Sequence, residues 1–313
     1  MLLKITNLSH SYNLEKTLDK ISFSMKNGEI IAILGKSGSG KSTLLGTIAG
    51  LLEPLSGSIK LRNKEIQKPS DKLIAGNNDI RIVKQDYGLF PNMSLRENIN
   101  YELRYFEEEY KLKTVQQLLE ICEIDTMAER LPRQVSGGQQ QRTAIAKAIS
   151  QKPALLLLDE PFSHLDFQNK LKLKSIIQKV VRQEKIGCLF VTHEVEDALS
   201  LADRLIILEN GKIIQEGSPE EIYNSPINHY VANLTGYTNI IAKNVLVRPE
   251  NFDVSTEENF DLKGILVKSS FIGRGYLNEI KLDNKKSVQV FTIRKLTENE
   301  VFLKINRSSK LKD

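Results

Sequence analysis

The sequence lacks a long apolar run. A membrane-spanning helix needs about 20 consecutive apolar residues, and the purest apolar stretch, residues 154–158, is bounded by Pro153 and Asp159. The first twelve residues alternate in the manner of a strand, without the charged head and apolar core of a signal peptide. We therefore expect a protein with no membrane-spanning helix and no secretory signal.

The sequence also has few cysteines and only a small excess of positive over negative charge. The 313 residues include two cysteines, Cys122 and Cys188, and both fall in apolar-periodic segments typical of a core, so a disulfide framework and an oxidising compartment are not expected. The 44 Lys and Arg residues exceed the 39 Asp and Glu residues by only five, dispersed along the chain, which does not predict nucleic-acid binding. We find no internal repeat and no sustained heptad.

What the sequence does have is strands that alternate with helices, which predicts an α/β fold with a largely parallel sheet. Strands are expected at residues 2–8, 21–25, 30–34, 80–83, 154–158, 188–192 and 205–208, and helices at 42–49, 168–183 and 195–202. Residues 94–150 have a helical pattern without a clear strand, which predicts a helical insertion.

The pattern of apolar and polar residues changes after residue 239. Residues 262–268, 276–282 and 287–291 alternate apolar and polar side chains and are separated by Gly, Asp and Asn. This pattern is typical of a small antiparallel β-barrel or sandwich. We therefore expect two domains, residues 1–238 and 239–313.

A glycine-rich loop follows the buried strand at residues 30–34. Gly35-Lys36-Ser37-Gly38-Ser39-Gly40-Lys41-Ser42 matches the phosphate-loop pattern and precedes a helix, the context that the pattern requires. Its backbone N–H groups and the helix N-terminus would bind phosphate, while Lys41 would reach the β- and γ-phosphates and Ser42 would ligate Mg²⁺. Because both flanking elements are correct, a nucleotide-hydrolysing P-loop protein is favoured over a flexible Gly/Ser-rich surface loop.

Polar residues follow the other buried strands. Gln85, Asp159 and His193 each come after a strand, on the edge where open α/β sheets bind ligands. Asp159 could hold Mg²⁺ and the adjacent Glu160 could polarise the attacking water. Gln85 could touch both the metal and that water, and His193 could sense the γ-phosphate. Taken singly, Gln85 and His193 are better explained as ordinary polar residues at strand ends, and their value comes from sharing one edge of the sheet.

A second helix start is rich in glycine. Ser136-Gly137-Gly138-Gln139 precedes a helical stretch, and a helix N-terminus of this kind can bind an anion. The residues alone also fit a plain helix start with a flexible cap, so both interpretations stay open at this point.

In order and spacing, six features together resemble the nucleotide-binding domains of ABC transporters. They are the phosphate loop, Gln85, the SGGQQQR run at 136–142, LLLLDEP at 155–161, residues 163–166 and His193, and the resemblance covers about residues 1–235. It implies a P-loop NTPase fold with a RecA-like core, an antiparallel β subdomain and a helical subdomain at about 94–150, and ATP and Mg²⁺ as cofactors.

The resemblance also implies roles. Tyr12 would stack on adenine, and Asp166 would link the two sites of a dimer. Nucleotide contacts fall on Gly35, Ser37, Gly38, Ser39, Gly40, Lys41, Ser42 and Thr43, and, for ATP bound to the other subunit, on Ser136, Gly137, Gly138 and Gln139. Mg²⁺ ligands would be Ser42, Gln85 and Asp159, with Glu160 as catalytic base, His193 as γ-phosphate switch and Gln85 as lid residue. Two departures from the family are Val135 in place of Leu and Lys147 in place of Arg.

Residues 87–99 resemble the corresponding segment of importers of the maltose, sulfate, iron and polyamine type. Residues 247–250 (VRPE), with 264–267 and 271–273, are similar to the transport-associated oligobinding (TOBE) domain of the same importers. This resemblance implies a peripheral protein on the cytoplasmic face of the inner membrane. It would work as a homodimer with transmembrane permease subunits and, indirectly, a solute-binding protein.

Two alternatives stay open from the sequence, an exporter ATPase and a non-transport ABC ATPase. The cargo is open as well, because it would contact the permease and the binding protein: iron, sulfate or another oxyanion, a polyamine, a quaternary amine or a sugar.

Overall fold

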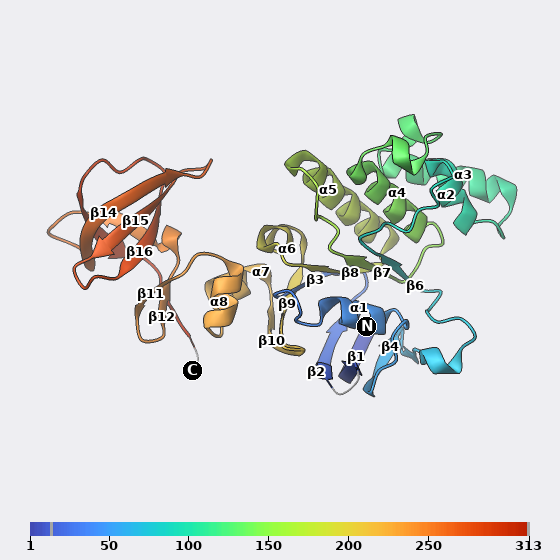
Figure 1. Cartoon of the computed structure of the whole chain (residues 1–313), viewed down its shortest axis with the longest axis horizontal. Coiled ribbons are helices and arrows are strands. Elements are labelled where there is room, and N and C mark those ends of the chain that lie inside the picture. The colour runs from blue at the N-terminus through green and yellow to red at the C-terminus, as the bar shows by residue number, and fades with distance from the viewer. Residues whose placement is uncertain (13–14, 312–313) are drawn as a thin grey trace. The chain divides into compact units, whose positions relative to one another are not determined.

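The computed structural model describes residues 1–12 and 15–311, and the chain forms two compact units, Met1–Pro219 and Glu220–Asp313 (Figure 1). No helix in the described ranges is long and apolar enough to cross a membrane. The helices α7 (Pro219–Asn224) and α8 (His229–Thr235) fall between the unit boundary and residue 239, where the sequence pattern changes. The domain limits 1–238 and 239–313 remain a prediction.

The first unit contains the predicted parallel sheet. Its strand order is β10-β9-β3-β8-β7-β6, and all but β10 run parallel. The strands are β3 (Ile30–Leu34), β6 (Ile80–Val83), β7 (Leu155–Asp159), β8 (Gly187–Thr192), β9 (Arg204–Glu209) and β10 (Lys212–Gly217). Every residue of β3 and β8 is buried, because helices cover both faces of the sheet, and this burial explains their unbroken apolar runs.

Helices cover this sheet on opposite faces (Figure 1). The helix α1 (Lys41–Ile48) lies on one face, and α5 (Phe167–Glu184) and α6 (Val195–Leu201) lie on the other. Beyond α1, a second sheet has the order β2-β1-β4-β5. Its strands are β1 (Leu3–Tyr12), β2 (Glu15–Met25), β4 (Ser56–Leu61) and β5 (Lys64–Glu65). One apolar core joins the two sheets around α1 and includes Leu8, Leu45 and Leu157.

The sequence missed parts of that second sheet. The described part of β2 begins at Glu15, six residues before the expected start, and β4 and β5 were not expected. β2 is the edge strand of its sheet and its first half is mostly exposed, so its polar side chains hide the strand pattern.

Between residues 94 and 150 the described regular structure is helical. It consists of α2 (Leu95–Glu102), α3 (Glu108–Ile121) and α4 (Gly137–Ile149), with the short 3-10 turns η2 (Asp125–Met127) and η3 (Pro132–Gln134). Ser94 and Glu97 cap α2 reciprocally, since the Ser94 hydroxyl accepts from the Glu97 N–H and the Glu97 carboxylate accepts from the Ser94 N–H.

The second unit carries the antiparallel β-sheets that the C-terminal pattern predicted. One sheet has the order β11-β12-β18, and the other has the order β13-β17-β14-β15-β16. The strands are β11 (Asn239–Ala242), β12 (Val245–Val247), β13 (Phe252–Ser255), β14 (Leu262–Phe271), β15 (Tyr276–Leu282), β16 (Ser287–Thr292), β17 (Glu300–Ile305) and β18 (Ser309–Lys310). Alternate residues such as Ile280, Val290 and Leu303 form its core. Arg248, directly after β12, is also buried and donates to the carbonyls of Tyr223, Ala232 and Tyr237.

Candidate active site

The site lies at the carboxyl edge of the parallel sheet. In the register of the sheet, Leu34 lies beside Thr192, Asp159 beside Val191, and Val83 beside Leu158. The residues that follow β3, β6, β7 and β8 therefore emerge side by side, as parallel strands require. This edge brings together the phosphate loop, Gln85, Glu160 and His193.

Lys41 closes the phosphate loop from inside. Its ammonium donates to the carbonyl oxygens of Gly35 at 2.9 Å and Lys36 at 3.0 Å. Burial lowers the pKa of the Lys41 ammonium, and the nearby carboxylates of Glu160 and Asp159 oppose that shift. A side chain on Gly35 is not tolerated, since its Cβ would lie 2.6 Å from Ser39 Oγ. The loop thus holds a positive charge at its centre.

The helix after the loop begins without a side-chain cap. Gly40, its N-cap, has φ 100°, a left-handed conformation that favours glycine. In residues 1–12 and 15–311, no side-chain hydrogen bond caps the first turn of α1. Those groups and the positive end of the helix dipole suit a phosphate.

Asp159 ends β7 and faces the start of α1. Its Oδ1 accepts a hydrogen bond from the Ser42 hydroxyl at 3.2 Å. Burial raises the pKa of the Asp159 carboxyl, the Ser42 hydrogen bond opposes the rise, and the charge of Glu160 adds to it. The chain's own groups thus under-compensate the ionised carboxylate.

Glu160 is held by two side chains from other strands. Gln85 Nε2 donates to Glu160 Oε2 at 3.0 Å, and His193 Nδ1 lies 3.1 Å from Glu160 Oε1. The backbone of Glu160 has φ 48°, a left-handed conformation that is unusual outside glycine. Its N–H donates to Val191 O at 3.1 Å, which supports that conformation. The carboxylate is therefore oriented by Gln85 and His193, which follow the ends of β6 and β8.

A cleft of about 570 Å³ opens above these residues. It is lined by Thr17, Ser37, Gly38, Gly40, Lys41, Ser42, Thr43, Glu160 and His193. Thr17 is the member that the sequence analysis missed, because it lies in the polar half of β2 and no spacing relates it to the phosphate loop. Ser39 is buried beneath the loop rather than in the cleft wall. Tyr12, at the end of β1, is 52% exposed and packs edge-to-face against His10 at 4.6 Å.

The SGG run starts α4 and does not contribute to this cleft. Ser136 and Gln139 form a capping box: Ser136 N–H donates to Gln139 Oε1 at 2.8 Å, and Gln139 N–H to Ser136 Oγ at 3.4 Å. A Cβ on Gly137 would lie 3.5 Å from the Tyr87 hydroxyl, and one on Gly138 would lie 3.2 Å from the Asn169 side chain. These glycines keep the start of α4 close to its neighbours.

Asp166 caps the next helix. Its Oδ1 accepts from the Asn169 N–H at 2.9 Å and its Oδ2 from Asn169 Nδ2 at 2.7 Å. Backbone and side-chain hydrogen bonds from Asn169 lower the pKa of the Asp166 carboxyl. Asp166 lies outside the lining of the cleft, as do Gln85 and Asp159 behind it.

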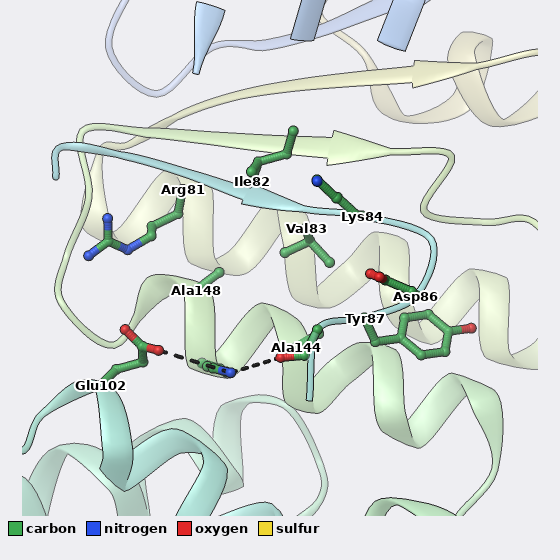
Figure 2. A pocket seen from close by; sticks show the side chains of 11 residues that line it. Arg81, Ile82, Val83, Lys84, Asp86, Tyr87, Glu102, Ala144 and Ala148 are labelled. Atoms are coloured by element: carbon green, nitrogen blue, oxygen red, sulfur yellow. Dashed lines mark hydrogen bonds and ion pairs between the residues drawn. The ribbon is translucent and has the colours of Figure 1, made fainter. Parts of the chain in front are cut away.

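A second cavity, of about 200 Å³, lies where β6 and residues 84–88 meet α2 and α4 (Figure 2). Lys147 lines it: its ammonium donates to Gly88 O at 2.8 Å and lies 4.0 Å from the Glu102 carboxylate. It also lies 4.1 Å from the centre of the Phe90 ring. Burial lowers the pKa of Lys147, and Glu102 opposes that shift. A single ammonium thus fixes the segment that follows Gln85, at the position where the family usually has Arg.

Comparisons with known proteins identify the family of the chain. Residues 18–163 match the family model described as ABC transporter. The spermidine/putrescine import ATP-binding protein PotA of Borrelia garinii subsp. bavariensis is 34% identical, with 96% of each chain covered. A probable sulfate/thiosulfate import ATP-binding protein, CysA of Chlorella vulgaris, is 37% identical over 75% of this chain and 99% of that one.

Among solved structures, a dimeric ATP-binding cassette in a post-hydrolysis state bound to ADP and Pi has a TM-score of 0.61. It is 28% identical and covers 70% of this chain and 99% of its own. The fold and the phosphate loop define a P-loop ATPase. The chain belongs to the ABC transporters, as an ATP-binding subunit of the import type whose reaction is ATP hydrolysis. The exporter and non-transport alternatives are thereby set aside.

Proposed function

We propose that two copies of this chain form two shared ATP sites, and that closure of this dimer drives the uptake of a polyamine through a separate permease. In each site the phosphate loop of one copy would face Ser136–Gln139 of the other. The observation that carries this proposal is that the glycine-rich start of α4 contributes nothing to its own chain's cleft. The solved relative bound to ADP and Pi is dimeric, which supports the same arrangement.

Hydrolysis needs a water activated beside the γ-phosphate. Lys41 and the uncapped N–H groups of α1 would hold the phosphates, which spread negative charge during phosphoryl transfer. Glu160 would accept a proton from the attacking water, and its hydrogen bonds with Gln85 and His193 would keep its carboxylate aimed. When ATP arrives, His193 could turn from Glu160 to the γ-phosphate.

Ser42 and Asp159 fit a Mg²⁺ ion. The pair offers a hydroxyl and a carboxylate, oxygen donors of the kind that Mg²⁺ prefers, and a cation would relieve the under-compensated charge of Asp159. No group of three or more His, Cys, Asp or Glu side chains in residues 1–12 and 15–311 could hold a metal, so phosphate oxygens and water would complete the shell. The ion would neutralise charge on the β- and γ-phosphates. Gln85 bonds to Glu160 rather than to this pair, so its place among the ligands requires a rotation.

The permease would bind near the cavity between β6 and α4 (Figure 2). Lys147 anchors residues 88–90 there, so a contact on this segment would be transmitted to Gln85 and from it to Glu160. This contact would keep the protein on the cytoplasmic face of the inner membrane.

A polyamine is the cargo that the comparisons favour. The match to the spermidine/putrescine ATPase covers 96% of this chain and so includes the C-terminal β-sheets, whereas the match to the sulfate/thiosulfate relative covers 75%. The test is ATPase activity of the assembled transporter, with its own permease and binding protein, in the presence of spermidine, putrescine or sulfate. Stimulation by sulfate alone would contradict this assignment.

The catalytic part is tested separately. Glu160→Gln is expected to bind ATP with near wild-type affinity, to accumulate as a closed dimer and to hydrolyse ATP at least about 100-fold more slowly. Nucleotide binding, size-exclusion chromatography with ATP, and phosphate release measure the three quantities. Full activity of this variant would remove Glu160 from its proposed role.

A further inference from the structure

We propose that Lys170 is a positioning residue for His193, and that it acts through Glu194. The proposal rests on the roles proposed above for His193 and Glu160. Lys170 would tie the turn that carries His193 to the first turn of α5, so that the His193–Glu160 pair depends on where that helix begins.

The turn that carries His193 is short and exposed. His193 follows the last residue of β8, and only Glu194 separates it from the first residue of α6. The side chain of His193 is 53% exposed, so packing does little to orient it. Its one directional contact in the described structure is Glu160 Oε1, at 3.1 Å from Nδ1. The backbone of the turn must therefore set the position of the imidazole.

Glu194 fixes that backbone from two sides. Its N–H donates to the Thr192 hydroxyl at 2.9 Å, and its carboxylate accepts a hydrogen bond from the Lys170 ammonium, with which it forms an ion pair. The side chain of Lys170 is 19% exposed and that of Glu194 is 37% exposed, so solvent screens the pair from the Glu194 side only. Burial lowers the pKa of Lys170, but Glu194 and Asp197 outweigh it and the pKa is raised, so Lys170 is a cation at neutral pH.

The other end of the link is the start of α5. Lys170 N–H donates to Asp166 O at 2.9 Å, the first hydrogen bond of the helix. The preceding residue, Asn169, touches α4: its Oδ1 accepts from Arg142 Nη1 at 3.4 Å, and it lies against Gly138. The first turn of α5 is therefore packed against the helix proposed to meet the partner's ATP. A shift of this turn on dimer closure would move Lys170 and, with it, Glu194 and His193.

A purely structural role is the competing explanation, and Lys174 supplies the matched control. Lys174 lies one turn further along α5, is 15% exposed, and pairs with Asp197 at 2.7 Å. Lys170 contacts the same Asp197 at 3.4 Å. Lys174, however, reaches Ser200 rather than Glu194, so its loss removes a comparable ion pair without touching the His193 turn.

The experiment compares Lys170→Met with Lys174→Met in the full-length chain, measuring Tm, ATP affinity, KM and kcat. Both variants are expected to lower Tm. Lys170→Met should lower kcat about tenfold, the scale of a misplaced catalytic contact, with KM for ATP and ATP affinity unchanged. Lys174→Met should keep kcat within about twofold of wild type. Lys170→Arg, which keeps the charge, should recover most of kcat.

A double-mutant cycle tests the route through Glu194. Glu194→Gln should reproduce the kcat loss of Lys170→Met, and the double variant should be no slower than either single variant, since one contact is removed in all three. Additive losses, a wild-type kcat for Lys170→Met, or an equal loss in Lys174→Met would each overturn the proposal. Glu160→Gln and His193→Ala are measured in parallel. Full activity in those two variants would reject the proposed function itself rather than the role of Lys170.

Discussion

Two glycine-rich helix starts in this chain are built in opposite ways. α1 begins at Gly40, in a left-handed conformation, and in the described part of the chain no side chain caps it. α4 begins at Ser136, in extended conformation, and Ser136 and Gln139 satisfy each other's N–H groups. The first helix start is open to a phosphate, and the second is internally satisfied.

The difference indicates that the two starts act at different stages. α1 can bind phosphate in the single chain, where Lys41 already sits within the loop. α4 has to exchange its own cap for an outside ligand, and the 3.4 Å bond from Gln139 N–H to Ser136 Oγ is the weaker half of that cap. An arrangement of this kind favours binding at α1 first and engagement of α4 only when a second copy brings its ATP.

The largest expected effect comes from separating the two starts into different subunits. Lys41→Ala and Gly138→Asp should each abolish hydrolysis, one by loss of phosphate binding and the other by adding negative charge where the partner's γ-phosphate would lie. A 1:1 mixture should recover about a quarter of the wild-type rate, because half of the dimers are mixed and each has one competent site. Phosphate release measures the rate.

The control for this mixture is each variant alone at the same total concentration. Gly138→Asp would place a Cβ 3.2 Å from the Asn169 side chain, which has to shift, so the fold of this variant is checked by its Tm. An acidic residue in the first turn of a helix is otherwise favourable, and the single-chain ATP affinity should stay at the wild-type value. A mixture as inactive as its components would contradict the idea that the two helix starts serve one ATP from different copies.

Much of this comparison was visible in the sequence. The buried strands β3, β7 and β8 are continuous apolar runs, so their ends, and with them Gly35, Asp159 and His193, could be located from pattern alone. The two glycine runs could be recognised as helix starts because each precedes a stretch with a helical pattern. The sequence could not show that one is open and the other capped.

The hydrogen bonds that orient Glu160 could not be predicted from the sequence, for a physical reason. Glu160 meets Gln85 and His193, which are 75 and 33 residues away, and only the register of β6, β7 and β8 brings them within hydrogen-bond distance. Thr17 and Lys170 carry no spacing signal at all. β4 was missed because it begins Ser56-Gly57-Ser58 and only Ile59 and Leu61 are buried, which is too short an alternation to predict a strand.

A smaller effect is expected at the cap of α4. Ser136→Ala removes both the N-cap and the hydroxyl that would meet the partner's phosphate. Loss of an N-cap of this kind costs about 1 kcal/mol, so the free energy of unfolding should fall by that amount. ATP binding at α1 should be unchanged while kcat falls about tenfold.

Urea unfolding measures the free energy of unfolding, and steady-state kinetics measure kcat. Ser94→Ala, which removes the cap of α2 instead, is the matched control. An equal loss of kcat in both variants would reduce the effect to helix stability.

The smallest expected effect is a gain in thermal stability when Asp159, beside the start of α1, is replaced. Because burial raises the pKa of the Asp159 carboxyl, its contribution to stability is present below the unfolded-state pKa of about 3.9 and is lost as the pH rises through the folded-state value. At pH 7 the ionised group therefore destabilises the nucleotide-free chain. Asp159→Asn should raise Tm at pH 7, with a smaller difference in acid, and should remove the extra stabilisation that Mg²⁺ adds to ATP. Thermal unfolding with ATP plus Mg²⁺ or plus EDTA measures both effects. A lower Tm for Asp159→Asn, together with an intact Mg²⁺ effect, would mean that Asp159 supports the empty fold rather than awaiting a cation beside α1.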